Sequence, residues 1–118
     1  MSDKPGKMSE KPGKRFSQGK TRYDLVSPVA LEELARVYTF GVEKYGDRNW
    51  EQGISLTGCY ASAMRHMQAW MMGENKDLES GLPHMAHAMW NMAAILHLTQ
   101  TRPEFDDRVK LAPGEGSL

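Results

Sequence analysis

Apolar side chains recur at intervals of three and four residues along three stretches of this chain, about residues 28–45, 56–72 and 83–101. In the first stretch they are Leu31, Leu34, Ala35, Tyr38 and Val42. This spacing places them on one face of an α-helix, whereas a half-buried strand requires strict alternation, which the sequence does not show. We therefore predict an all-α fold, a small antiparallel bundle of three to four helices.

Local signals mark where these helices begin and end. Ser27 before Pro28 is a typical helix start, because the hydroxyl can accept a backbone hydrogen bond and proline needs none at the first helical position. Gly46 suits a left-handed cap after the first helix. Ser55 or Thr57 can cap the second helix.

The third helix, from near Pro83 to near Thr101, is apolar on nearly every side. Three helices cannot cover all of that surface, so we predict that the bundle is completed by homo-oligomerisation, as a dimer or a tetramer. Seven of the nine methionines lie in the second and third helices, which favours a pliable core over a recognition surface. The segment 104–110 can add a short terminal turn of helix.

The two ends of the chain differ in composition from its middle. Residues 1–24 contain KPGK twice and hold seven Lys or Arg against three acids, with little apolar content before Phe16. Such a segment buries too little surface to offset its ordering entropy. We expect residues 1–18 to be a flexible basic segment, residues 19–110 a single all-α domain, and residues 111–118 a flexible tail.

The charge balance and the cysteine content argue against several classes of function. The formal net charge is zero, so no global field attracts duplex nucleic acid or an anionic membrane. The longest apolar run, 85–98, is interrupted by His87, Asn91 and His97 and is shorter than the ~20 residues of a membrane helix. Cys59 is the one cysteine and no secretion signal opens the chain, so we expect a cytoplasmic protein.

Three polar side chains share one stripe of the third helix. His84, His87 and Asn91 project at about 0°, 300° and 340° when each residue turns the helix by about 100°. The two imidazoles lie one turn apart and can reach one ligand or one metal ion. Two core histidines hydrogen-bonded to backbone or carboxylate groups would show the same pattern, and the sequence leaves both interpretations open.

Acidic residues lie just before this stripe. Glu74, Asp77 and Glu79 belong to the short, turn-rich link between the second and third helices. Several carboxylates near two imidazoles are what a divalent cation needs. Stabilisation of acids by the helix dipole is the other explanation, and it applies best to Glu79.

A third histidine lies midway along the second helix. His66 would meet the third helix's histidines if the two polar stripes face each other, and a pocket of three histidines would follow. Arg65 adjoins His66, and Trp70 lies one turn further on. The alternative, in which Arg65 is solvated and His66 simply packs, is equally compatible with the sequence.

Two short clusters combine cations with aromatic rings. GKTRYDL places Lys20 and Arg22 beside Tyr23, and GVEKYGDRNW places Lys44 near Trp50. Cations that meet phosphate oxygens and a ring that stacks on a base suit a nucleotide. A solvated segment at the entry to the domain would look much the same as the first cluster.

The second cluster also contains an acid and an amide, Glu43 and Asn49. We single out Glu43 among the acids of the first helix because it lies beside this mixture of groups. Glu32 and Arg36, by contrast, have the i, i+4 spacing of an ordinary surface ion pair.

The chain resembles a family of small, mostly phage-encoded proteins, the dATP/dGTP diphosphohydrolases, which are relatives of the all-α MazG-like nucleotide pyrophosphatases. The resemblance covers about residues 19–100, through KTRYDLVSPVALEELARVYTFGVEKYGDRNW and RHMQAWMMGENKDLESGLPHMAHAMWN. The wider MazG-like group carries a Glu-x-x-Glu pair and a Glu-x-x-Asp pair that bind magnesium. Here only ENKD, from Glu74 to Asp77, has the second form.

The resemblance implies metal-dependent hydrolysis of a (deoxy)purine triphosphate to the monophosphate and pyrophosphate. The expected catalytic residues are Glu43, Glu74 and Asp77. The expected ligands of the metal, Mg²⁺ or Mn²⁺, are Glu43, His66, Glu74, Asp77, Glu79, His84 and His87. The expected nucleotide contacts, which balance phosphate charge, stack on the base or read its edge, are Lys20, Arg22, Tyr23, Lys44, Asn49, Trp50, Arg65, Trp70 and Asn91.

Two other classes of protein remain open at this stage. A non-catalytic module could retain a nucleotide in the same pocket, as in a phage protein that sequesters a host signalling nucleotide. A structural oligomer whose histidines merely pack would bind no ligand at all. In each case the expected location is the cytoplasm, that of the host cell if a phage encodes the chain.

Overall fold

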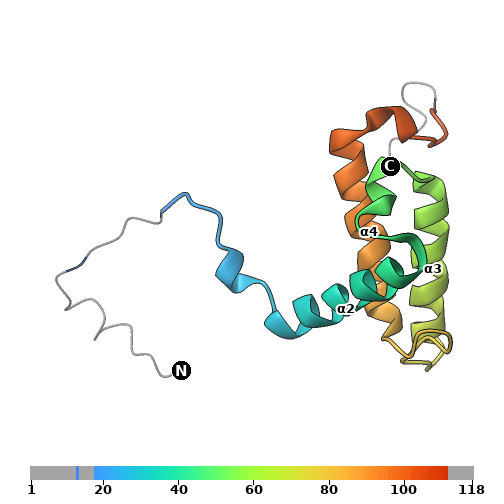
Figure 1. Cartoon of the computed structure of the whole chain (residues 1–118), viewed down its shortest axis with the longest axis horizontal. Helices are drawn as coiled ribbons and strands as arrows, with labels where there is room; N and C mark the ends of the chain where they lie inside the picture. Colours follow the sequence, from blue (N-terminus) through green and yellow to red (C-terminus); the bar gives the residue numbers. More distant parts are fainter. Residues whose placement is uncertain (1–12, 14–17, 112–118) are drawn as a thin grey trace.

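The structure, a computed structural model, describes residue 13 and residues 18–111. Three long helices, α2 (Pro28–Tyr45), α3 (Leu56–Met71) and α4 (His84–Thr101), dominate it (Figure 1). They are accompanied by the 3-10 turns η1 (Tyr23–Leu25), η2 (Asn49–Gln52) and η3 (Pro103–Phe105). The described residues contain no strand and only one isolated bridge, between Lys76 and Pro83. The predicted all-α fold is confirmed.

The helices begin and end where the local signals place them. The Ser27 hydroxyl accepts a hydrogen bond from the Ala30 N–H at 3.0 Å at the start of α2. After α2, Gly46 has a φ of 90° and donates its N–H to the Val42 carbonyl at 2.9 Å. Of the two residues proposed to cap α3, Ser55 is the one that does so.

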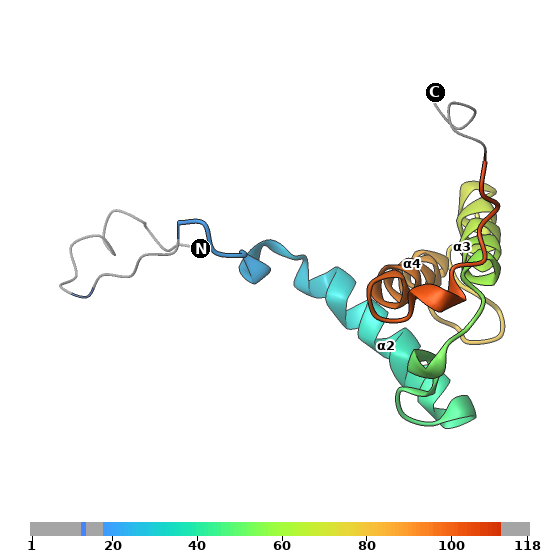
Figure 2. The same cartoon turned by 90° about the horizontal axis from the view of Figure 1, so that it is seen from above.

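Helices α3 and α4 form an antiparallel pair, and α2 crosses α4 steeply instead of running along it (Figures 1 and 2). Small side chains fill much of the core, which allows the helices to approach closely. The buried apolar residues are Val37, Leu56, Cys59, Ala63, Ala86, Ala88, Ala94 and Leu98.

The N-terminal part of α2 and the η1 turn extend well beyond the other helices (Figures 1 and 2). We call residues 20–31 the arm. Every residue of the arm is exposed except the half-buried Ala30. Its apolar side chains are between 54% and 80% exposed: Tyr23, Leu25, Val26, Val29 and Leu31.

The link between α3 and α4 is held in place by backbone hydrogen bonds. The Glu74 N–H donates to the Ala69 carbonyl at 3.0 Å, and the His84 N–H donates to the Asn75 carbonyl at 2.9 Å. The Asp77 N–H donates to the Leu82 carbonyl at 2.8 Å. The acids of this link are therefore carried on a fixed backbone.

The residues after α4 run back over the start of α3. Asp107 accepts hydrogen bonds from the Ser55 hydroxyl at 2.8 Å and from the Thr57 N–H at 2.9 Å. The short terminal helix expected within 104–110 is reduced to the η3 turn, because residues 106–111 leave the helical conformation. We call residues 102–111 the C-terminal strap.

Two further expectations concern the ends of the chain and the membrane. The predicted flexible segments 1–18 and 111–118 lie outside the described residues, apart from residues 13, 18 and 111. Within the described part of the chain, no helix is both long and apolar enough to cross a membrane.

Candidate functional site

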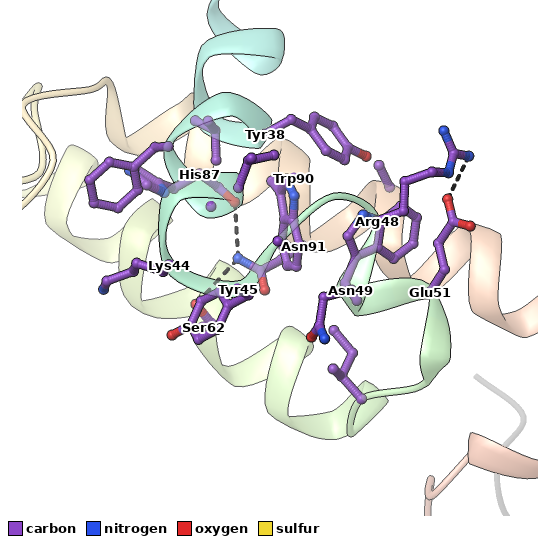
Figure 3. Close-up of a pocket in the computed structure, with 18 of the residues that line it drawn as sticks. Tyr38, Lys44, Tyr45, Arg48, Asn49, Glu51, Ser62, His87, Trp90 and Asn91 are labelled. Carbon is purple, nitrogen blue, oxygen red and sulfur yellow. Dashed lines mark hydrogen bonds and ion pairs between the residues drawn. The ribbon is translucent and has the colours of Figure 1, made fainter.

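A pocket of about 1090 Å³ lies between the C-terminal half of α2, the η2 turn and the inner faces of α3 and α4 (Figure 3). Its lining divides into two ends with different chemistry. The polar end contains Lys44, His66, Asp77, Glu79 and His87. The aromatic end contains Tyr38, Trp50, Trp90 and His97, and Ser62 and Asn91 line the wall as well.

Three imidazoles from two helices meet at the polar end. His66 Nδ1 lies 2.9 Å from His84 Nδ1. The ring of His66 also stacks on that of His87, with centroids 4.7 Å apart and planes 11° from parallel. Of the two interpretations that the sequence left open for His66, the structure shows the one in which it meets the histidines of α4, and it meets both of them.

The hydrogen bonds around His84 define where the protons lie. His84 is buried, and its Nε2 lies 2.7 Å from a carboxylate oxygen of Glu74. A carboxylate only accepts, so His84 Nε2 carries the proton and donates it. In the neutral imidazole, His84 Nδ1 then accepts from His66 Nδ1–H, which leaves His66 Nε2 as a free acceptor or metal ligand.

The carboxylate of Asp77 is oriented by its neighbours in the link. Its Oδ2 accepts hydrogen bonds from the Ser80 N–H at 2.9 Å and from the Ser80 hydroxyl at 3.0 Å. The same oxygen lies 3.9 Å from His87 Nε2, and the Ser80 hydroxyl lies 2.7 Å from that nitrogen. Asp77, Ser80 and His87 therefore form one connected group.

Electrostatics favour the charged form of Asp77 and the neutral forms of His66 and His87. Burial acts to raise the pKa of Asp77, but the hydrogen bonds from Ser80 outweigh it and the pKa lies below its usual value. Burial and the neighbouring imidazoles lower the pKa of His66. Burial also lowers the pKa of His87, despite the opposing charge of Asp77. Neutral imidazoles are the form that binds metal ions.

Three of these side chains are close enough together to hold one cation. Ligand atoms of His66, Asp77 and His84 all lie within 4.8 Å of one another. Two imidazole nitrogens with one carboxylate oxygen suit Mn²⁺, Fe²⁺ or Zn²⁺ better than Mg²⁺, which prefers oxygen ligands. Glu74 contacts this set through His84, as a residue that orients a ligand.

The aromatic end forms a continuous wall. Trp50 lies with its ring centroid 6.0 Å from those of Tyr38 and Trp90 and 4.9 Å from that of His97. The ring planes are inclined by 56° to 70° to one another. Rings at such angles cannot sandwich a flat ligand between them, so a base would stack against the exposed face of one ring.

An amide and two ion pairs complete the lining. Asn91 donates from Nδ2 to the His87 carbonyl at 2.9 Å and to the Ser62 hydroxyl at 3.2 Å, which leaves its carbonyl oxygen for a ligand (Figure 3). Lys44 Nζ lies 2.8 Å from Glu79. Arg48 pairs with Glu51 in the η2 turn.

The structure brings together one part of the set expected from the sequence. The residues that line the pocket are Lys44, Asn49, Trp50, His66, Asp77, Glu79, His87 and Asn91, and His84 and Glu74 contact this group. The others lie elsewhere: Lys20, Arg22 and Tyr23 are on the arm, Glu43 is exposed on α2, and Arg65 and Trp70 are exposed on α3. Within a single chain these six do not reach the pocket.

Sequence reasoning missed most of the aromatic wall. Trp90 and His97 are seven residues apart on α4, so they project from nearly the same side of the helix, and this spacing could have identified them. Tyr38 was assigned to the apolar face of the first helix, with no role in the site. Ser80 carries no sequence signal, because its role depends on the folded shape of the link.

The fold and the pocket define an all-α domain that encloses a mixed imidazole, carboxylate and aromatic site. A family model described as "dATP/dGTP diphosphohydrolase, N-terminal" matches residues 10–108, and the chain belongs to this family. The family expected from the sequence is thereby confirmed.

A relative supports the same family. The chain is 38% identical over 96 residues to a protein of Salmonella phage PMBT28 named dATP/dGTP diphosphohydrolase. The match covers 81% of this chain and 33% of that protein, so the chain spans about a third of the relative's length. No solved structure matches the chain.

Proposed function

We propose that this domain binds a deoxypurine triphosphate in the pocket and hydrolyses it to the monophosphate and pyrophosphate with a divalent metal ion. The observation that carries the proposal is the joining of two chemistries in one cavity. The imidazole–carboxylate group at the polar end suits a metal and phosphates, and the aromatic end suits a base. Family membership and the name of the phage relative support the choice of reaction.

The metal would be held by His66, Asp77 and His84, with Glu74 orienting His84 through Nε2. His84 would bind through Nδ1, so the ion would displace the hydrogen bond between His84 Nδ1 and His66 Nδ1. When bound, a divalent ion polarises the phosphates and lowers the pKa of an attacking water. This donor set favours Mn²⁺ over Mg²⁺ as the activating ion. Glu79 and His87 lie at the same end of the pocket and are candidates for a second ligand set.

The remaining residues of the pocket would bind and orient the nucleotide. Lys44 would exchange its surface contact with Glu79 for a phosphate oxygen, because a phosphate carries the greater charge. Trp50 offers a ring face to the base. Asn49 and the free carbonyl oxygen of Asn91 would read the edge of the base.

Incubation with each deoxynucleoside triphosphate and either Mn²⁺ or Mg²⁺, followed by ion-exchange chromatography of the products, tests the proposal. We expect a monophosphate and pyrophosphate in equal amounts. Asp77→Asn and His66→Ala should each reduce turnover at least ~100-fold, a loss of the size expected when a metal ligand is removed. Glu32→Gln, an exposed acid paired with Arg36, is the matched control and should turn over normally. Unchanged turnover in Asp77→Asn would contradict the assignment.

A second function is favoured by a specific observation. The carboxylates of Glu74, Asp77 and Glu79 each have a hydrogen-bond or ion-pair partner within the chain. A pocket whose acids are already engaged can hold a nucleotide without cleaving it. An unchanged nucleotide that still raises the melting temperature would select this binding module over the enzyme.

We also propose that the domain acts as a homo-oligomer in the cytoplasm, that of the host cell if a phage encodes it. Helical spacing places four exposed apolar side chains on the side of α3 and α4 that faces away from the pocket. We call this surface the back face; it consists of Tyr60, Met64, Met92 and Leu96. Large apolar side chains exposed on one side of a helix pair are typical of an interface between subunits.

A further inference from the structure

The pocket does not supply enough positive charge for a polyphosphate. Among the residues that the structure describes, two cations line it, Lys44 and Arg48, and each is paired with an acid in the same lining. Four acids of this described part line it: Asp47, Glu51, Asp77 and Glu79. The lining is therefore net negative, so even with one divalent ion bound a triphosphate needs further cations from elsewhere.

Two exposed cations that do not line the pocket of their own chain are on the arm. Lys20 and Arg22 precede η1, and the Arg22 guanidinium is held by Asp24 at 2.8 Å with both side chains more than half exposed. Such an exposed ion pair is worth little and can be exchanged for a phosphate. The basic segment of the arm thus has the charge that the acidic pocket lacks.

The arm cannot bring these cations to the pocket of its own chain. Helix α2 is continuous from Pro28 to Tyr45, and its C-terminal half, from Val37 on, contributes to the pocket. At about 1.5 Å per residue, Pro28 lies roughly 20 Å along the helix from the residues near Val42 that line the pocket. The arm leads away from α3, α4 and the C-terminal end of α2 in both views (Figures 1 and 2).

The arm also has the surface of a segment that packs against something. The first turns of an isolated helix gain little stability in water without a packed apolar face. Here Val29 and Leu31, together with Leu25 and Val26 before the helix, are all more than half exposed. The arm therefore has basic residues next to exposed apolar ones. The surface that complements it is acidic at one point and apolar beside that point.

We infer that the arm of one copy docks on a second copy of this chain and places Lys20 and Arg22 at that copy's pocket. The pocket of the partner supplies the acidic surface, and the aromatic and aliphatic side chains along the exposed edge of its pocket face those of the arm. The site is then complete only in the oligomer, with the metal ligands from one chain and phosphate-binding cations from the other. The identity of the ligand rests on the proposed function; the contact between arm and pocket does not.

Thiol cross-linking tests the contact without any activity. Two preparations in a Cys59→Ala background carry Lys20→Cys and Asn49→Cys, the second residue being exposed at the rim of the pocket. A short bis-maleimide should join the two variants in a mixture, with the joined peptides identified by mass spectrometry. Lys110→Cys, equally exposed on the C-terminal strap, replaces Lys20→Cys in the control and should give little product. Equal yields from both mixtures would overturn the inference, as would a cross-link within one chain carrying both substitutions.

Subunit complementation tests the function of the contact. Co-expression of Asp77→Asn with Lys20→Ala/Arg22→Ala mixes a chain with a damaged pocket and a chain with a damaged arm. Each variant alone should be inactive. If pocket and arm come from different chains, random mixing restores about a quarter of wild-type turnover, because half of the pockets are intact and half of those receive an intact arm. Full activity of Lys20→Ala/Arg22→Ala would overturn the inference.

The two experiments separate the inference from the proposed function. A specific cross-link in a protein that hydrolyses no nucleotide supports the arm contact and rejects the enzyme. Turnover by the wild type with no cross-link and no complementation supports the enzyme and rejects the arm contact.

Discussion

His84 is the residue through which α3 and α4 share one polar network. It is buried at the start of α4, and its two ring nitrogens contact Glu74 and His66 from opposite sides. The hydrogen bond from Nε2 to Glu74 fixes the orientation of the ring and leaves Nδ1, which accepts from His66, as the nitrogen that a metal ion would take. The orientation of this ring therefore depends on Glu74 as much as on the helix that carries it.

Removal of this orienting carboxylate should weaken metal binding while the ligands remain. We expect Glu74→Ala to lower the affinity for Mn²⁺ about 10- to 100-fold, as is usual when the hydrogen-bond partner of a ligating histidine is lost. Isothermal titration calorimetry of the ion alone measures this. Glu32→Ala is the control, because Glu32 is exposed on α2 and remote from the pocket. An unaltered Mn²⁺ affinity in Glu74→Ala would show that His84 is not oriented this way.

The histidines also predict how stability depends on pH. The pKa values of His66 and His87 in the folded chain lie below the 6.5 of the free side chain, chiefly because of burial. Between pH 6.5 and the lower pKa values of the folded chain, the unfolded chain therefore binds more protons than the folded chain. The free energy of unfolding falls as the pH is lowered across this interval. Above pH 6.5 the two histidines leave stability unchanged.

Melting temperatures measured between about pH 8 and pH 5 should therefore fall on the acid side. Each variant is compared with its own value at pH 8, so that lost packing does not confuse the result. His66→Gln and His87→Gln should each flatten the dependence. Identical acid-side slopes in the wild type and both variants would exclude these residues as its source.

At the scale of secondary structure, local chemistry made the helices predictable. The caps at Ser27, Ser55 and Gly46 act over three or four residues, so the sequence alone contains them. The sequence could only offer the meeting of His66 with α4 as one of two alternatives, because it depends on which faces of α3 and α4 pack together. The three histidines, His66, His84 and His87, all lie on helices, so they are the part of the site that depends least on loop structure.

The parts of the site that sequence could not place depend on long-range geometry. Ser80 joins the site because of the folded shape of the link, and no local signal in the sequence indicates its contacts with Asp77 and His87. Lys20 and Arg22 were expected at the pocket, but neither lines it, because α2 is continuous from Pro28 to Tyr45 and the arm precedes it. Neither the direction of a helix nor the path of a loop follows from apolar spacing.

The C-terminal strap packs against the end of the η2 turn at Gly53. This glycine has a φ of 121°, and a β-carbon there would collide with the ring of Phe105 in the η3 turn. The absence of a side chain therefore lets the strap pack directly on the turn that carries Trp50.

Gly53→Ala should destabilise the chain by about 1–3 kcal/mol, from backbone strain and the displaced Phe105 ring. Gly73→Ala is a matched control, because Gly73 also has a positive φ, 100°, but open space around its β-carbon position. The difference between the two variants in urea denaturation isolates the contact with Phe105. Equal losses of stability in Gly53→Ala and Gly73→Ala would mean that the strap moves away from the added methyl group at no measurable cost in the free energy of unfolding.

At the scale of the whole molecule, the described residues of one chain leave the arm and the back face uncovered. The arm projects away from the other helices (Figure 2), and helical spacing places the back face on the side of α3 and α4 opposite the pocket lining. Helix α4 is apolar on nearly every side, and α2 and α3 each cover one side of it. No element of the described chain covers Met92 and Leu96 on its remaining side. A second copy is the simplest partner for surfaces that every copy presents.

The back face gives a test of assembly that is independent of the pocket. Leu96 is 62% exposed on α4, so Leu96→Glu should leave the fold of the single chain intact. A charge buried at a subunit interface without a partner is strongly unfavourable, so this variant should sediment nearer to the 13.3 kDa of one chain, whereas the wild type sediments as a dimer or tetramer. Thr39→Glu, exposed on α2 and outside both the pocket and the back face, is the control and should assemble normally. If wild-type protein sediments as a single chain at micromolar concentration, or if Leu96→Glu assembles as the wild type does, the back face is not an interface between copies.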